Sequence, residues 1–118
     1  MYAHVNNAVY ATYLEEGRDA WTDAVLGDDG DPWDYVLARV AIDFRRELTL
    51  ADKVAVVSIE LARIGTSSVT LRERITTPDG TLAAEAEAVL VARDRETGRS
   101  RPLTDIEREA FTKGLAES

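Results

Sequence analysis

The stretch that decides the fold is HVNNAVYATYLEEGRDAW, residues 4–21. After Asn7 the apolar residues recur at spacings of three and four, which is the period of an amphipathic helix. Asn6 or Asn7 can cap the first turn by accepting a hydrogen bond from a free backbone N–H. Gly27 and the Asp-rich run after it form a stop signal, so the sequence predicts one long helix over residues 6–26. Its polar side chains are expected mostly on the solvent-facing side: Thr12, Glu15, Glu16, Arg18, Asp19, Thr22 and Asp23.

Beyond this helix the hydrophobic period changes to two, which indicates β-strands. Four strands are predicted, over residues 36–45, 53–64, 67–76 and 81–93. Thr77-Pro78-Asp79-Gly80 is a strong turn between the last two strands, and a short amphipathic helix over residues 102–115 begins near Thr104 or Asp105. Short connections between strands favour a largely antiparallel sheet. The predicted fold class is therefore α+β, in a single domain spanning residues 1–118.

Composition narrows the function classes. The 118 residues include 14 Lys and Arg against 22 Asp and Glu, a net charge of −8, which argues against nucleic-acid binding. The chain has no Cys and one His, so disulfides, thiolate nucleophiles and Cys- or His-rich metal sites are excluded. No apolar run is long enough to span a membrane, and the first residues do not resemble a secretion signal. We therefore expect no membrane partner and a cytoplasmic location.

A single helix on a curled sheet leaves strand edges and apolar surface exposed. Exposed edges are stabilised when they pair with another copy of the chain. The predicted architecture therefore favours a homodimer or a homotetramer.

The start of the long helix is the first candidate for chemistry. Free N–H groups in its first turn lie close to aromatic residues of the same helix, and such a helix terminus can stabilise a carbonyl oxygen that becomes negatively charged. The alternative is purely structural, with Asn6 serving only as the helix cap.

The same stretch resembles the HVNN-x-x-Y-x-x-Y-x-E-x-x-R segment of hot-dog-fold acyl-CoA thioesterases, the group similar to 4-hydroxybenzoyl-CoA thioesterase. The resemblance continues through ARVAIDFRREL, RIGTSSVTLRERI and AEAEAVLVARDRETGRSRPL, and so covers nearly the whole chain. It implies a hot-dog fold, in which a curled antiparallel sheet wraps a long central helix. It also implies hydrolysis of an acyl-CoA or of an acyl-carrier thioester, with no metal or redox cofactor.

One feature of the family falls outside this sequence. Family members begin with a further strand that ends in a catalytic aspartate four residues before the His of HVNN, and that position would precede Met1. The resemblance thus implies that the first family strand and its aspartate belong upstream of this chain. The alternative is a short, noncatalytic hot-dog module that binds acyl-CoA without hydrolysing it.

Candidate residues for catalysis lie at the helix start and along it. The thioester carbonyl is expected against the N–H groups of Val5 to Asn7, with His4 orienting substrate or water and Glu15 as a substitute base. Their structural alternatives are a hydrogen-bonded loop His4 and a solvated Glu15 or one paired with Arg18. Asn7 stands where some relatives carry a catalytic His. Tyr10 and Tyr13 are expected to line the acyl pocket or to belong to the core.

The phosphates of coenzyme A require a local positive group in an acidic protein. The strand corner from Arg63 to Ser68 offers one: Gly65 allows close backbone approach, while Arg63, Thr66, Ser67 and Ser68 supply hydrogen-bond donors. Arg72 and Arg74 share one strand face and can extend this patch, whereas Arg45, Arg46 and the arginines from Arg93 to Arg101 are expected as exposed edge charges. By resemblance, the site lies between protomers and combines a helix start from one with the corner of the other.

Overall fold

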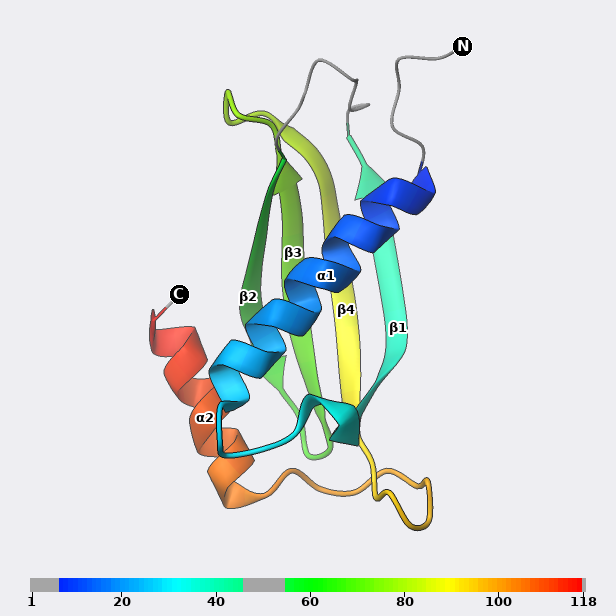
Figure 1. Cartoon of the computed structure of the whole chain (residues 1–118), viewed down its shortest axis with the longest axis vertical. Coiled ribbons are helices and arrows are strands. Elements are labelled where there is room, and N and C mark those ends of the chain that lie inside the picture. Colours follow the sequence, from blue (N-terminus) through cyan, green and yellow to red (C-terminus); the bar gives the residue numbers. More distant parts are fainter. Residues whose placement is uncertain (1–6, 46–54, 118) are drawn as a thin grey trace.

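A long helix lies against four antiparallel strands (Figure 1). The computed structural model describes residues 7–45 and 55–117. In chain order the elements are α1 (Asn7–Leu26), the 3₁₀ turn η1 (Pro32–Asp34), β1 (Tyr35–Phe44), β2 (Val56–Ile64), β3 (Ser68–Thr76), β4 (Leu82–Ala92) and α2 (Asp105–Glu117). The predicted order of helix, four strands and terminal helix is confirmed, and only η1 was not predicted.

The four strands form one sheet in the order β1-β4-β3-β2, with every neighbouring pair antiparallel. The predicted turn between β3 and β4 is present: the Thr77 amide donates to the Thr81 carbonyl over 2.9 Å, and Gly80 adopts a φ of 87° that favours glycine. Within residues 7–45 and 55–117, β1 and β2 each pair with a strand on one side only. Both therefore present a free edge.

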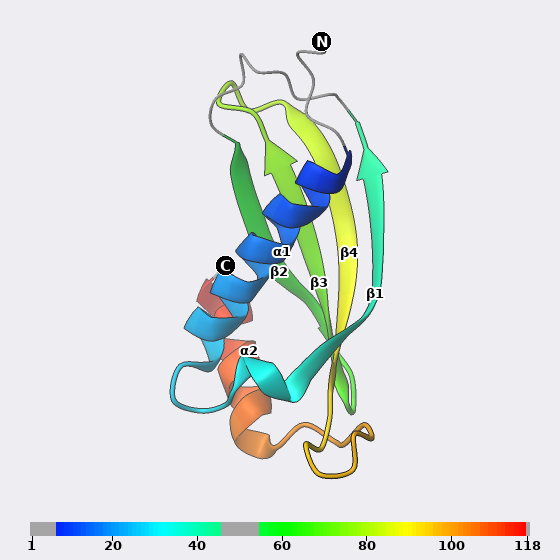
Figure 2. The same cartoon turned by 45° about the vertical axis from the view of Figure 1, so that its right-hand side comes forward.

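Helix α1 covers one face of the sheet, here called the inner face, and crosses it diagonally (Figures 1 and 2). Its first turn lies near the end of β1, whereas its last turn lies near β2 and α2 (Figure 1). Small residues on β4 allow close packing on this face. Four of them are almost completely buried: Ala83, Ala84, Ala86 and Ala88.

Gly17 is the point of closest approach between α1 and the sheet. A Cβ atom at this position would lie 2.5 Å from Cγ1 of Val57 and 3.3 Å from its Cβ. Such distances are far inside van der Waals contact, so only glycine lets the helix lie this close to β2.

Two apolar clusters lie under α1. One surrounds Tyr10 and Leu14 near the start of the helix, and the other surrounds Leu26 and Phe111 near its end. Along β3, Ile75 belongs to the first cluster and Leu71 to the second, and the fully buried Glu73 lies between them.

Arg18 fills the space between these clusters. Its guanidinium donates two hydrogen bonds to the Glu73 carboxylate, at 2.7 and 2.8 Å, and both side chains are almost completely buried. The prediction that Arg18 and Thr22 face solvent was wrong, because a spacing of four from Leu14 places both in the buried row of the helix. Thr22 satisfies its hydroxyl by donating to the Arg18 carbonyl, and Arg18 pairs with Glu73 rather than with Glu15.

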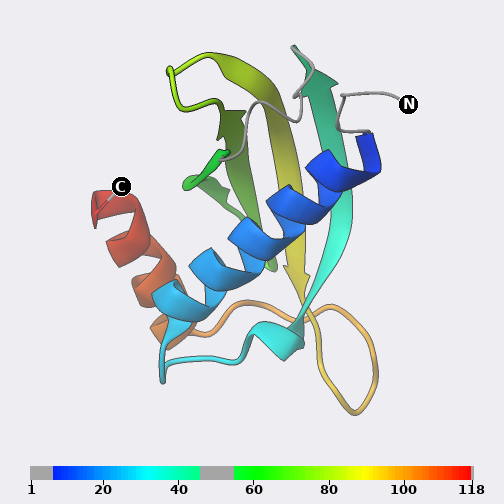
Figure 3. The same cartoon turned by 45° about the horizontal axis from the view of Figure 1, so that its top comes forward.

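Helix α2 packs beside the end of α1 and against β2 (Figure 3). Thr104 and Glu107 form a reciprocal capping box: each side chain accepts a hydrogen bond from the other's backbone N–H, at 3.1 and 2.8 Å. Phe111 then inserts between α1 and β1, stacking on Trp21 and meeting Tyr35 edge-on. Neither of these helices is both long and apolar enough to cross a membrane, as far as residues 7–45 and 55–117 extend.

We expect Gly17→Ala to destabilise the protein by about 1–3 kcal/mol, because the overpacking against Val57 outweighs the roughly 1 kcal/mol gain in helix propensity. Urea unfolding measures the loss. The Gly17→Ala/Val57→Ala double variant should lose less than the sum of the two single variants. Additive losses would show that α1 does not approach β2 at this residue.

We expect Glu73→Gln to cost about 3–5 kcal/mol of unfolding free energy, because it leaves the buried Arg18 charge without its partner. The matched variant Arg18→Met/Glu73→Leu removes both charges and should stay within about 1 kcal/mol of the original chain. A Glu73→Gln variant with unchanged stability would mean that the pair is not desolvated.

Candidate functional site

A pocket of about 250 Å³ lies between α1 and the start of β1. It exists because α1 crosses the sheet diagonally and leaves the inner face at the beginning of β1 uncovered (Figure 1). Its lining residues are Glu15, Arg18, Asp19, Thr22, Pro32, Tyr35, Leu37 and Leu90. Apolar groups of the sheet form one wall of this α1–β1 pocket, and charged or polar groups of the helix form the other.

An apolar strip continues from the pocket along β1. Leu37, Val40 and Phe44 are 45%, 40% and 43% exposed, which is unusual for large apolar side chains on one strand. Their register partners Leu90, Ala88 and Ala84 all belong to the buried side of β4, so the three face α1. At the far end of this β1 strip, Phe44 meets Tyr10 of α1 with ring centroids 5.1 Å apart. The strip therefore joins the pocket to the first turn of the helix.

Of the predicted helix-start residues, only Asn7 is among the described residues. Asn7 begins α1, while His4, Val5 and Asn6 lie outside the described residues. Tyr10 is buried in the core beside Leu14, and the half-buried Tyr13 packs against the same cluster. Tyr10 thus lies in the core of the protomer.

Glu15 lies on the exposed rim of the α1–β1 pocket. Eight residues separate it from Asn7, which corresponds to about 12 Å along the helix axis. A carboxylate at that distance reaches a group bound in the pocket, but it does not reach a carbonyl bound at the amides of the first turn.

The predicted corner from Arg63 to Ser68 forms the connection between β2 and β3. The Gly65 amide donates to the Ser68 carbonyl over 2.7 Å, and a Cβ at Gly65 would lie only 2.9 Å from the Ser68 hydroxyl oxygen. The Arg108 guanidinium of α2 donates hydrogen bonds to the carbonyls of Gly65 and Thr66 and so attaches the corner to α2. Thr66 and Arg63 remain exposed.

Within one chain, this corner and the helix start lie at opposite ends of the sheet (Figure 1). Strand β3 begins at the corner with Ser68 and ends at Thr76, which corresponds to about 27 Å at the usual rise of a strand. One protomer therefore does not bring the two predicted halves of the site together.

Arg72 and Arg74 share the outer face of the sheet, as predicted. Both contact Glu60, at 3.0 and 3.5 Å, and Arg74 also contacts Glu85 at 3.6 Å. Their charges are thus balanced by carboxylates, which makes them poor candidates for extending an anion-binding patch from the corner.

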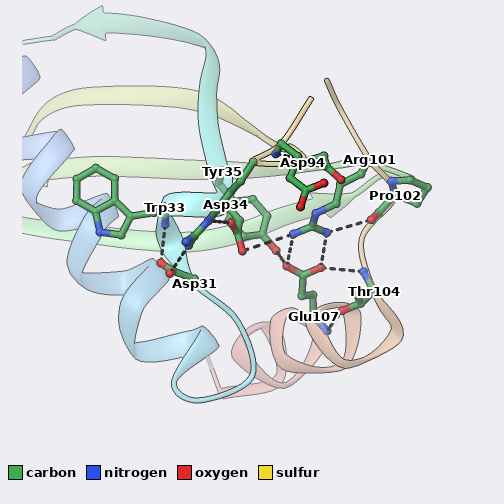
Figure 4. A network of polar contacts seen from close by, with 11 residues as sticks. Asp31, Trp33, Asp34, Tyr35, Asp94, Arg101, Pro102, Thr104 and Glu107 are labelled. Atoms are coloured by element: carbon green, nitrogen blue, oxygen red, sulfur yellow. Dashed lines mark hydrogen bonds and ion pairs between the residues drawn. The ribbon is translucent and has the colours of Figure 1, made fainter. Parts of the chain in front are cut away.

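A polar network at the base of the pocket was not predicted (Figure 4). Glu107 of α2 is 3% exposed and accepts hydrogen bonds from the Tyr35 hydroxyl and from both terminal nitrogens of Arg101, the latter at 2.8 and 3.1 Å. Arg101 also lies 3.9 Å from Asp34 of η1. The expectation of an exposed edge charge was wrong for Arg101, because this half-buried side chain ties α2 to η1.

Burial and hydrogen bonding in this network shift the pKa values of Glu107 and Tyr35. Burial raises the pKa of the Glu107 carboxyl, but hydrogen bonds from Arg101, the Thr104 amide and Tyr35 outweigh it and lower that pKa to about 2. Burial and then the hydrogen bond to the Glu107 carboxylate raise the pKa of Tyr35 well above its usual range. Glu107 therefore stays ionised and Tyr35 stays protonated at neutral pH.

The sequence contained one signal for this network. The pattern Thr104-x-x-Glu107 at a helix start is typical of a capping box, so the position of Glu107 at the start of α2 could have been predicted. Its contact with Tyr35, 72 positions away, has no local sequence signal. In the parts of the chain that the structure describes, no group of three or more His, Asp or Glu side chains is placed to hold a metal ion.

Comparison with known proteins gives a consistent result. The family model of the thioesterase-like superfamily matches residues 1–111. The long-chain acyl-CoA thioesterase FadM of Escherichia coli K12 is 32% identical over 107 residues, which cover 85% of this chain and 78% of FadM.

Solved structures agree with this match. A thioesterase from Thermus thermophilus, crystallised with coenzyme A and Zn, superposes with a TM-score of 0.85 at 30% identity, covering 97% of this chain and 83% of that one. A predicted thioesterase from Bacillus stearothermophilus gives a TM-score of 0.83 at 25% identity, covering 96% and 84%. The chain therefore has the hot-dog fold and belongs to the thioesterase-like superfamily.

Proposed function

We propose that this protein is an acyl-CoA thioesterase, which hydrolyses a thioester to a carboxylic acid and coenzyme A, and that its substrates carry long acyl chains. The single observation that carries the chain-length proposal is the β1 strip, since it exposes apolar side chains continuously from the helix start to the α1–β1 pocket. The similarity to FadM, named as a long-chain acyl-CoA thioesterase, supports the same conclusion.

The dimensions of the β1 strip suit an extended acyl chain. Leu37 and Phe44 are seven residues apart, which corresponds to about 20 Å along a strand. With the thioester at the start of α1, the acyl chain lies against Phe44, Val40 and Leu37 in turn and ends in the pocket. Burial of each methylene on this surface contributes about 0.8 kcal/mol to binding, so a long chain gains far more than a short one.

Hydrolysis at the helix start follows from the chemistry of a thioester. Backbone N–H groups of the first turn polarise the carbonyl and stabilise the negative charge on its oxygen as the carbonyl carbon is attacked. A carboxylate takes a proton from water, whose oxygen bonds to that carbon. The C–S bond then breaks with its electron pair going to sulfur, and the proton passes to the thiolate or to solvent. Thiolate leaves readily, so no strong acid is required.

Two carboxylates are candidates for this base. One is the catalytic aspartate that the family resemblance implies for the start of α1. The other is Glu15, about 12 Å further along the helix. Because Glu15 does not reach a carbonyl at the helix start, we assign the base role to the aspartate that the resemblance implies and place Glu15 beside the acyl chain.

We further propose that the active protein is a homodimer joined through β1, or a tetramer built from such dimers. The ten residues of β1 present a free edge that pairs readily with an identical strand. A two-fold axis makes this pairing antiparallel, so the Tyr35 end of one β1 lies beside the Phe44 end of the other. The corner of one protomer is thereby brought toward the helix start of its partner, where it can bind the phosphates of coenzyme A.

Purified protein should release free thiol from long-chain acyl-CoA faster than from short-chain acyl-CoA. A thiol reagent measures the release without background, because the chain contains no Cys. Glu15→Gln should change kcat by less than about tenfold, since Glu15 is not the base. Acyl-CoA binding without any hydrolysis would instead identify a noncatalytic binding module.

The composite site predicts complementation between two defective subunits. One subunit carries Asn6→Ala at the helix start, and the other carries Arg63→Glu at the corner. A mixed dimer, purified through two different tags, contains one site with both defects and one with none, so it should recover about half of the original activity. Each homodimeric variant is the control. A mixed dimer no more active than the average of the two controls would place the whole site within one protomer.

A further inference from the structure

Tyr35 lines the α1–β1 pocket at the end of β1 that lies away from the helix start. This side chain is 8% exposed and lines the pocket together with Leu37 and Leu90. Its ring is fixed from behind by Phe111 of α2, which meets it edge-on with ring centroids 5.8 Å apart. An acyl chain that enters from the helix start along the β1 strip therefore reaches the Tyr35 ring after Leu37.

The hydroxyl of Tyr35 is fixed as firmly as its ring. It donates a hydrogen bond to Glu107, which is itself held by two hydrogen bonds from Arg101 and one from the Thr104 amide (Figure 4). Among the described residues, no buried side-chain nitrogen or oxygen lacks a hydrogen-bond partner, so this network is fully satisfied. A ring held by packing on one side and by a charged hydrogen bond at its tip resists displacement more than an apolar side chain in the same place.

We propose that Tyr35 is the end wall of the acyl pocket and sets the maximum length of the acyl chain, and that Glu107 is the positioning residue that keeps this wall in place. The inference rests on the proposed function, because it assumes that an acyl chain occupies the pocket. It assigns a role in substrate selection to α2, whose own residues line neither the helix start nor the pocket.

The test measures binding rather than hydrolysis. S-alkyl-CoA thioethers of increasing length cannot be hydrolysed, and titration calorimetry gives the affinity of each. Affinity should rise by up to about fourfold per added methylene until the chain reaches Tyr35, and then stop rising or fall. The length at which this happens is the cut-off.

Substitutions at Tyr35 should move the cut-off in opposite directions. Tyr35→Ala removes the wall and should shift it to longer chains, whereas Tyr35→Trp enlarges the wall and should shift it to shorter ones. General destabilisation cannot produce shifts of opposite sign. If Tyr35→Ala does not fold, Tyr35→Phe and Glu107→Gln test the same point, because both weaken the hydrogen bond that fixes the Tyr35 ring. Alkyl chains longer than the cut-off should then regain several-fold in affinity, while shorter ones bind as before.

Glu109→Gln is the matched control, because Glu109 lies on the exposed side of the same helix. It should leave the cut-off unchanged. The inference is overturned if the folded Tyr35 and Glu107 variants share one cut-off with the original chain, or if affinity does not depend on chain length. A protein that hydrolyses acyl-CoA but shows a fixed cut-off would contradict only this inference. One that shows the shifts without hydrolysis would contradict only the proposed reaction.

Discussion

The buried ion pair between Arg18 and Glu73 fixes how α1 lies on the sheet. It stands between two apolar clusters on the inner face, and its two hydrogen bonds are directional where the apolar contacts are not. Two charges withdrawn from water are stable only while they remain paired, so rotation or sliding of the helix is strongly opposed. With Gly17 lying against Val57, the pair sets both the angle and the depth of the helix.

The functional surface is a consequence of that placement. Because α1 crosses the strands diagonally, it covers β2 and β3 near its end and leaves the inner face of β1 partly open (Figure 1). A helix aligned with β1 would bury Leu37 and Val40 and close the pocket. The fold thus leaves an apolar surface exposed, which is costly in an isolated protomer and useful for binding an acyl chain and for pairing with a second copy.

Much of this architecture could be predicted from the sequence, because local patterns decide it. The period of three to four over residues 6–26, the period of two in the strands and the turn at Pro78–Gly80 were enough for the order of elements. Pairing across long distances was not predictable. Arg18 was placed on the solvent side because a charged residue usually faces water, and its partner Glu73 lies 55 positions away. Arg101 was misjudged for the same reason, since its partner Glu107 is buried by contacts between distant parts of the chain, among them the hydrogen bond from Tyr35.

A crystal structure of the dimer with a long-chain S-alkyl-CoA thioether tests the central claim most directly. The account predicts sulfur at the first turn of α1, the alkyl chain along Leu37, Val40 and Phe44, and the nucleotide near the partner's corner. An alkyl chain bound elsewhere on the protein, with the space between α1 and β1 unchanged, would contradict it.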